Sequence, residues 1–162
     1  MTDKIRLMFV DDEEDFVDYM TRHLEESNLE VHAFQNPVQA LKKTSGETFD
    51  VGLLDLKMPG MDGEEMLKKL KERDPHMEII ILTGHPSIES AFRTSKNGAY
   101  EYLSKPCDFD VLLGAINKAY AKHIKSLNRN QSERVNTLMK SASRLSPLEL
   151  LKRLKKLRKS KK

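Results

Sequence analysis

The stretch IRLMFVDD, residues 5–12, runs from apolar side chains directly into two adjacent carboxylates. Its first six residues are mostly aliphatic or aromatic, which is typical of a strand buried inside a parallel sheet. Three more acids follow at once, Glu13, Glu14 and Asp15, and no basic residue lies among the five. Like charges at this spacing repel one another, so either solvent or a bound cation must stabilise them. The stretch therefore predicts a buried strand that ends at an acidic edge.

The same pattern, a short apolar run followed by a longer amphipathic segment, occurs five times. The predicted strands are residues 5–10, 29–34, 50–55, 78–83 and 100–104. Strict alternation of strands and helices implies a parallel sheet with helices on both faces, and right-handed crossovers make that sheet doubly wound. The sequence therefore predicts an α/β fold, a doubly wound five-stranded parallel sheet, followed by a helical C-terminal tail.

Composition narrows the class of protein. Of the 162 residues, 38% are hydrophobic and 33% are charged, which is typical of a globular protein with a highly charged surface. No apolar run approaches the roughly 20 residues that span a bilayer, and the N-terminus is too polar for a signal peptide. The single cysteine, Cys107, cannot form an internal disulfide, which fits a reducing compartment. We therefore expect a cytoplasmic protein without a membrane span.

The net charge of +3 hides a division between the two ends of the chain. Residues 1–117 contain 13 Lys and Arg against 23 Asp and Glu, a balance of −10. Residues 118–162 contain 15 Lys and Arg against two acids, a balance of +13. We therefore expect a globular domain over residues 1–124 and a basic, partly helical extension over residues 125–162.

The tail sequence SPLELLKRLKKLRKSKK, residues 146–162, predicts a short basic amphipathic helix. Ser146 and Glu149 have the spacing of a capping box. The apolar positions follow at helical spacing: Leu150, Leu154 and Leu157. Such a helix is compatible with a partner groove, an acidic membrane surface or nucleic acid, and equally with docking on the acidic domain or with no fixed structure.

Charged and hydroxyl side chains lie at or directly after the carboxyl ends of four of the five predicted strands, and they are the candidate functional residues. They are Asp11, Asp12, Asp55, Thr83 and Lys105. The carboxyl ends of parallel strands share one edge of a sheet, where ligands of doubly wound folds bind. Clustered carboxylates need a cation, and hard oxygen ligands with open positions suit Mg²⁺, which would still accept a phosphate oxygen. Glu13, Glu14 and Asp15 are interpreted as solvated acids in the first turn of the next helix.

Four segments together resemble the receiver domain of two-component response regulators. They are VDDEEDF (10–16), LLDLKMPGMDG (53–63), ILTGH (81–85) and GAYEYLSKP (98–106), and the resemblance covers about residues 3–122. It implies a flavodoxin-like sheet with the strand order 2-1-3-4-5.

The resemblance also implies roles for the acidic residues. Asp55 would be the phosphoacceptor, whose carboxylate attacks the phosphorus of a phosphohistidine. Asp11 and Asp12 would hold Mg²⁺ together with Asp55 and the backbone carbonyl of Lys57. The metal would offset charge on the phosphoryl oxygens.

Three further residues acquire roles in the same way. Lys105 would pair with a phosphoryl oxygen, aimed by a cis peptide bond to Pro106. Thr83 would donate its hydroxyl to another phosphoryl oxygen, and Tyr102 would turn inward behind it as part of the switch. These movements would reshape the face made by the fourth predicted helix, the fifth strand and the fifth helix.

The leading hypothesis is a single-domain response regulator, a phosphoacceptor and not an enzyme beyond assisting its own phosphorylation and dephosphorylation. A sensor histidine kinase or phosphotransfer protein would supply the phosphoryl group. The output would be contact with a downstream protein whose identity the sequence does not reveal.

Two alternatives belong to other functional classes. A transcription regulator would contact DNA through the basic tail, although the tail is too short for a winged helix and contains no clear helix-turn-helix. A Mg²⁺-dependent phosphohydrolase would use Asp55 as a nucleophile, but Asp55-Leu56-Lys57 lacks the second acid two positions on that would serve as general acid.

Overall fold

The computed structural model describes residues 4–142 and 146–159. The chain falls into two compact units, Met1–Ile124 and Lys125–Lys162, and the division lies within one helix. Each unit is therefore described by itself.

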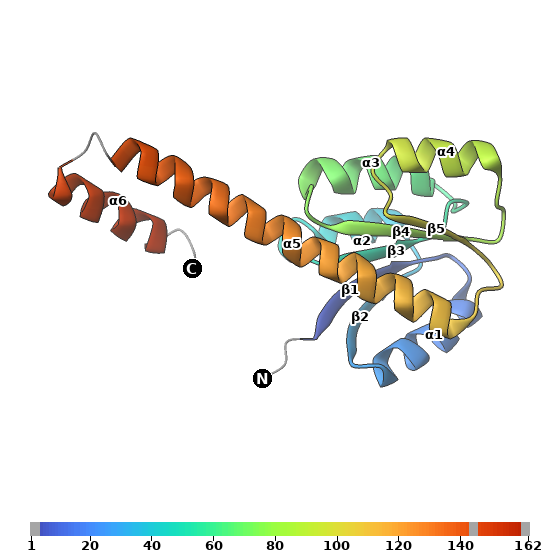
Figure 1. Cartoon of the computed structure of the whole chain (residues 1–162). Helices are drawn as coiled ribbons and strands as arrows, with labels where there is room; N and C mark the ends of the chain where they lie inside the picture. The colour runs from blue at the N-terminus through green and yellow to red at the C-terminus, as the bar shows by residue number, and fades with distance from the viewer. Residues whose placement is uncertain (1–3, 143–145, 160–162) are drawn as a thin grey trace. The chain divides into compact units, whose positions relative to one another are not determined.

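Five parallel strands form a single sheet in the first unit (Figure 1). They are β1 (Ile5–Val10), β2 (Leu29–Phe34), β3 (Val51–Leu54), β4 (Glu78–Thr83) and β5 (Glu101–Ser104). Their spatial order is β2-β1-β3-β4-β5, and every neighbouring pair is parallel. The predicted doubly wound fold and its strand order are both confirmed.

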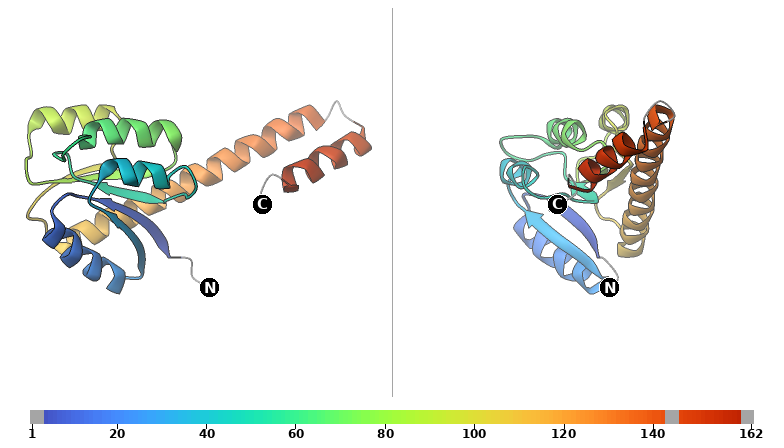
Figure 2. Two further views of the ribbon diagram at one scale, coloured as in Figure 1. Left: turned by 180° about the vertical axis from the view of Figure 1, so that it is seen from behind. Right: turned by 90° about the vertical axis from the view of Figure 1, so that its left-hand side faces the viewer.

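Helices cover both faces of this sheet (Figures 1 and 2). They are α1 (Glu14–Glu26), α2 (Pro37–Lys43), α3 (Gly63–Arg73), α4 (Ile88–Lys96) and α5 (Phe109–Ala142). Alternate residues of β1 point to opposite faces, as the two-residue period of a strand requires. Leu7 and Phe9 pack in a cluster with α1 and the first part of α5, whereas Met8 and Val10 pack in a second cluster with α2 and α3.

Strand register brings the predicted functional positions to one edge. Val10 pairs with Leu54, so Asp11 and Asp55 follow neighbouring strands at the same level. The backbone N–H of Asp55 also donates to the carbonyl of Val10 at 3.0 Å. Thr83 pairs with Ser104, which places Lys105 beside the end of β4.

The opposite, N-terminal edge of the sheet contains a buried histidine. His123 of α5 is only 5% exposed. Its Nδ1 lies 2.6 Å from the carbonyl oxygen of His76, and its Nε2 lies 3.2 Å from Oδ1 of Asp50. The other oxygen of Asp50 accepts a hydrogen bond from the backbone N–H of Arg6. Both ring nitrogens face acceptors, so the protonated imidazolium, which donates from both nitrogens, fits this site better than either neutral tautomer.

The pKa values of this pair agree with its geometry. The hydrogen bond to Asp50 raises the pKa of His123 above its ordinary value of 6.5, against the effect of burial. Burial opposes the charge of Asp50, but its hydrogen bonds from His123 and Arg6 outweigh burial and lower its pKa below 3.8. Charged groups nearby include Asp74 and the ion pair of Lys122 with buried Glu78. The pair therefore stabilises the packing of α5 on the sheet.

We predict that His123→Gln lowers the free energy of unfolding by about 1–2 kcal/mol, with the largest effect between pH 3.8 and 6.5. A histidine whose folded pKa is raised stabilises fully below its unfolded pKa, and this stabilisation is lost as pH rises through the folded pKa. Asp50, with a lowered pKa, contributes above 3.8 and loses its contribution as pH falls through the folded value. Urea unfolding at about pH 6 and about pH 9 measures the difference.

The matched control is His85→Gln, since His85 is exposed and follows the carboxyl end of β4, at the opposite edge of the sheet from His123. A His123→Gln effect that is equal at both pH values would contradict the charged state assigned to His123.

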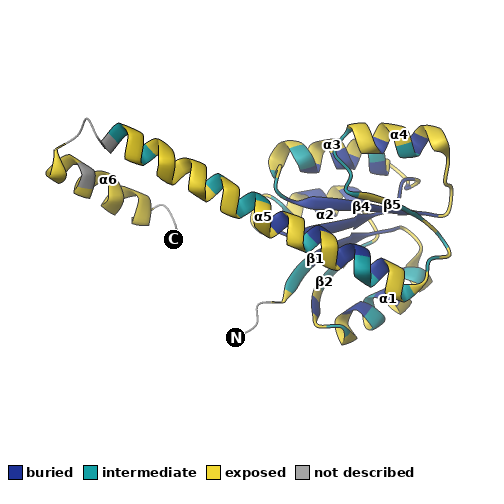
Figure 3. Cartoon of the chain, viewed as in Figure 1, coloured by how far each residue is buried: buried dark blue, intermediate teal, exposed yellow. Residues whose placement is uncertain are grey.

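The second unit consists of the part of α5 from residue 125 onward and α6 (Pro147–Lys159). The predicted capping box is present, because the backbone N–H groups of Glu149 and Ser146 each donate to the other's side chain, at 3.4 and 3.0 Å. Leu154 and Leu157 remain 47% and 44% exposed, whereas the side chain of Leu150 lies outside the described residues. Most residues of this unit are exposed (Figure 3). Within the part of the chain that the structure describes, no helix is long and apolar enough to cross a membrane.

Candidate functional site

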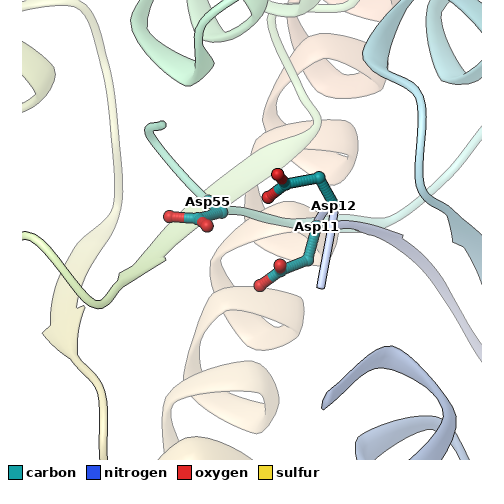
Figure 4. Close-up of side chains that lie close together, drawn as sticks. All are labelled: Asp11, Asp12 and Asp55. Atoms are coloured by element: carbon teal, nitrogen blue, oxygen red, sulfur yellow. The ribbon is translucent and has the colours of Figure 1, made fainter. Parts of the chain in front are cut away.

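Three carboxylates converge at the carboxyl edge of the sheet (Figure 4). Asp11 and Asp12 follow β1, Asp55 follows β3, and one oxygen from each lies within 4.8 Å of the others. Asp11 and Asp55 are almost completely buried, with 1% and 3% exposure, whereas Asp12 is exposed. The cluster is therefore open to solvent on the side of Asp12.

Lys105 inserts its ammonium group among these carboxylates. Its Nζ lies 2.6 Å from Oδ2 of Asp11, 3.6 Å from Oδ2 of Asp55 and 3.3 Å from Oε1 of Glu13. The Lys105–Pro106 peptide bond is cis, as predicted, and the backbone N–H of Lys105 donates to the carbonyl of Thr83. A lysine 94 positions from Asp11 thus becomes its closest charged partner.

The pKa values show incomplete charge compensation. Burial raises the pKa of Asp11 and outweighs the hydrogen bonds from Lys105 and from the backbone of Glu13. Burial also disfavours the charged form of Lys105, but its hydrogen bond with Asp11 and the charges of Asp11 and Asp55 raise its pKa overall. One ammonium group faces several carboxylates, so the edge retains a negative excess.

This donor set fits a hard divalent cation. Each of the three aspartates offers a carboxylate oxygen to a common centre. Oxygen donors with one solvent-facing side match Mg²⁺, which retains several water ligands in proteins. Lys57, whose backbone carbonyl the resemblance adds to this set, lies in the loop after β3.

The loop after Asp55 is held close to the site by one glycine. Oδ1 of Asp55 accepts a hydrogen bond from the backbone N–H of Leu56, and the N–H of Gly63 donates to the carbonyl of Leu56 at 2.8 Å. A Cβ atom at Gly63 would lie 2.1 Å from the carbonyl oxygen of Asp55. Only glycine allows the start of α3 to approach the backbone of Asp55 this closely.

Thr83 and Tyr102 both contact the segment between β4 and α4. The buried Thr83 hydroxyl accepts a hydrogen bond from the backbone N–H of His85 at 3.1 Å. The Tyr102 hydroxyl accepts one from the backbone N–H of Ser87 and lies 2.6 Å from the hydroxyl of Ser90. Both residues therefore adjoin the segment that leads into α4, Thr83 from the end of β4 and Tyr102 from within β5.

Two residues at this site make contacts with Lys105 that were not predicted from the sequence. Glu13 was interpreted as a solvated helix acid, but its carboxylate also pairs with Lys105. The Lys105 ammonium lies 4.2 Å from the centre of the Phe16 ring, a cation–π distance. Phe16 belongs to the apolar pattern of α1, and nothing in its spacing signals contact with a lysine 89 positions away.

Comparison with known proteins identifies the family. The sequence model of the family described as the response regulator receiver domain matches residues 7–117. This chain belongs to the response regulator receiver family.

Solved receiver domains share the fold. A receiver domain protein from Methanospirillum hungatei JF-1 aligns with a TM-score of 0.74 and 31% identity, covering 76% of this chain and 99% of that one. A receiver domain from Clostridium thermocellum aligns with a TM-score of 0.70 and 34% identity, covering 76% and 98%. The resemblance seen in the sequence is therefore confirmed.

Curated relatives include longer regulators. The DNA-binding transcriptional regulator NtrC of Escherichia coli K12 is 34% identical over 114 residues, which are 70% of this chain and 24% of that protein. The transcriptional regulatory protein ZraR of Klebsiella oxytoca is 34% identical over 119 residues, 74% of this chain and 27% of that one. The receiver thus spans about a quarter of the length of these relatives.

We predict that Gly63→Ala destabilises the receiver by about 1–3 kcal/mol, because its new methyl group collides with backbone and not with a movable side chain. Gly46→Ala is the matched control, since a Cβ at Gly46 would meet no atom within 4 Å. Urea unfolding of both variants measures the difference, and equal stabilities would contradict the close approach of α3 to Asp55.

Proposed function

We propose that this receiver accepts a phosphoryl group on Asp55 and signals through protein contacts. The observation that carries the proposal is the buried Asp55 carboxylate beside Asp11, Asp12 and the Lys105 ammonium. The phosphoryl donor is a sensor histidine kinase or a phosphotransfer protein, and we place the reaction in the cytoplasm. The receiver is a phosphoacceptor and not an enzyme with a separate substrate.

In the proposed transfer, a carboxylate oxygen of Asp55 attacks the phosphorus of a phosphohistidine. The new O–P bond forms as the N–P bond breaks, and the imidazole leaves with the electron pair of that bond. Asp11, Asp12, Asp55 and the Lys57 carbonyl would hold Mg²⁺, which offsets phosphoryl charge when bound. The ammonium of Lys105, already 3.6 Å from Asp55, pairs with a phosphoryl oxygen.

The proposed switch uses hydrogen bonds that already converge on one segment. Phosphorylation adds about 1.5–2 negative charges and strong acceptor oxygens at Asp55. The Thr83 hydroxyl then donates to a phosphoryl oxygen, which changes its present bond with the backbone of His85. Tyr102 is bonded to Ser87 and Ser90 at the start of α4, so it follows the same movement.

The output surface in this proposal is the face of α4, β5 and the first part of α5. Ile88 and Phe92, one turn apart on α4, are 90% and 59% exposed. Such exposed apolar side chains suit contact with a downstream protein. A change at the start of α4 would therefore alter the position of the residues that a partner meets.

We predict that incubation with acetyl phosphate and Mg²⁺ yields an acid-labile monophosphorylated protein, detected by intact-mass spectrometry. Asp55→Asn abolishes the adduct because an amide is a far poorer nucleophile than a carboxylate. EDTA and Asp12→Asn each reduce it strongly, since both remove the proposed metal. Asp110→Asn, an exposed acid in the first turn of α5, is the matched control. An undiminished adduct in Asp55→Asn would overturn the proposal.

We predict that Tyr102→Phe leaves the rate of phosphorylation within about twofold of wild type but reduces the response of α4. The variant retains the ring and loses both hydroxyl contacts with residues 87 and 90. Hydrogen exchange of residues 85–90, with and without phosphorylation, measures the response. Tyr100→Phe is the control, and an unchanged exchange response in Tyr102→Phe would exclude this residue from the switch.

The hypothesis of a phosphohydrolase has no observation in its favour, because residue 57, two positions after Asp55, is a lysine and cannot serve as a carboxylic general acid. The hypothesis of a DNA-binding regulator depends on the basic surface of the second unit.

A further inference from the structure

Helix α6 presents an apolar surface beside basic side chains. Leu151, Leu154 and Leu157 line one shallow hollow of about 460 Å³ together with Lys155 and Arg158. The three leucines are 55%, 47% and 44% exposed. We call these three leucines the leucine face; within the second unit it retains large exposed apolar side chains that a folded helix normally buries.

The remaining surface of α6 is basic. At 3.6 residues per turn, Lys152, Lys156 and Lys159 recur at i, i+4 and i+7 and lie roughly opposite the leucine face. Residues 125–162 contain 13 Lys and Arg against two acids. One of these acids, Glu149, already accepts hydrogen bonds in the capping box. Two acids can neutralise at most two of these 13 positive charges, so the second unit keeps a large positive excess.

Part of α6 is already packed within the second unit. Leu157 and Leu138 line a hollow together with Asn130, Glu133 and other residues of α5. This contact involves Leu157 at the end of the leucine face, whereas Leu151 and Leu154 do not line that hollow. An occupant of the leucine face must therefore bury at least two leucines and accept the basic charge around them.

We propose that α6 binds the surface of a membrane that contains anionic phospholipids. An amphipathic helix with Leu on one face and Lys and Arg on the other lies in the plane of the membrane interface. The leucine face would enter the boundary of the acyl chains, and the basic side chains would contact phosphate headgroups.

The positive charge and the exposed leucines of α6 together favour an anionic membrane over the other possible partners. A second copy of the same helix would bring together two units with a balance of +11 each, which repel. Duplex DNA would neutralise lysines and arginines, but phosphate contacts leave the leucines in water. An anionic bilayer can bury the leucine face and pair with the basic side chains at the same time. The inference does not depend on the proposed phosphorylation, since all of its residues lie in the second unit.

The test is sedimentation of the full chain with vesicles of phosphatidylcholine alone or mixed equally with phosphatidylglycerol. We expect binding only to the anionic vesicles, and weaker binding as salt rises, because salt screens the headgroup charge. Leu154→Gln should weaken binding about tenfold by removing an apolar side chain from the interface. Lys152→Gln combined with Lys156→Gln should weaken it about 25-fold, fivefold for each charge.

Leu148→Gln is the matched control, because Leu148 is exposed on the same helix but does not line the leucine hollow. Gln has a helix propensity close to that of Leu and Lys, and circular dichroism checks that the helices persist. Each of four outcomes overturns the proposal: no sedimentation, equal binding to both vesicles, equal losses in Leu148→Gln and Leu154→Gln, or preference for duplex DNA that Leu154→Gln leaves unchanged. Self-association that lipid does not affect would assign the leucine face to a second copy instead.

Discussion

The buried pair of carboxylates at the carboxyl edge of the sheet is the constraint on which the receiver depends. Asp11 and Asp55 directly follow neighbouring strands and are buried, and each would be costly as a lone charge. The ammonium of Lys105 contacts both, and backbone N–H groups add one hydrogen bond to each. This compensation is partial, because one lysine faces several acids. In the proposed function, the remaining negative excess would draw a divalent cation to this edge and, through the cation, a phosphoryl group.

The two edges of the sheet differ in how their charges are balanced. At the N-terminal edge, the His123 ring faces one carboxylate, that of Asp50. Both ring nitrogens of His123 and both carboxylate oxygens of Asp50 have a partner. Such a site is complete and stabilises the fold. At the carboxyl edge, the acids outnumber the cation and Asp12 faces solvent. A rigid sheet therefore connects a balanced, structural edge to an unbalanced edge that can bind ligands.

The fold could be predicted because the period of apolar residues changes from strand to helix five times in order. The strand order could not be derived from alternation alone, and it came from the resemblance. Asp11, Asp55 and Lys105 could be brought together from the sequence because each follows a strand of a parallel sheet. Phe16 and His123 could not, since their contacts depend on how helices pack over the sheet. The partners of His123 lie 47 and 73 positions away, without any recurring spacing.

Charge is also divided between the two units, and this division would let one chain perform the two kinds of binding proposed for it. Residues 1–124 contain 15 Lys and Arg against 23 acids, whereas residues 125–162 carry a balance of +11. An acidic unit attracts cations to its carboxylate cluster but is repelled by anionic surfaces. A basic unit repels cations and is attracted to anionic surfaces. Since phosphorylation of Asp55 would add charge to the acidic unit alone, the residues that would hold the chain at an anionic surface differ from those that would carry its signal.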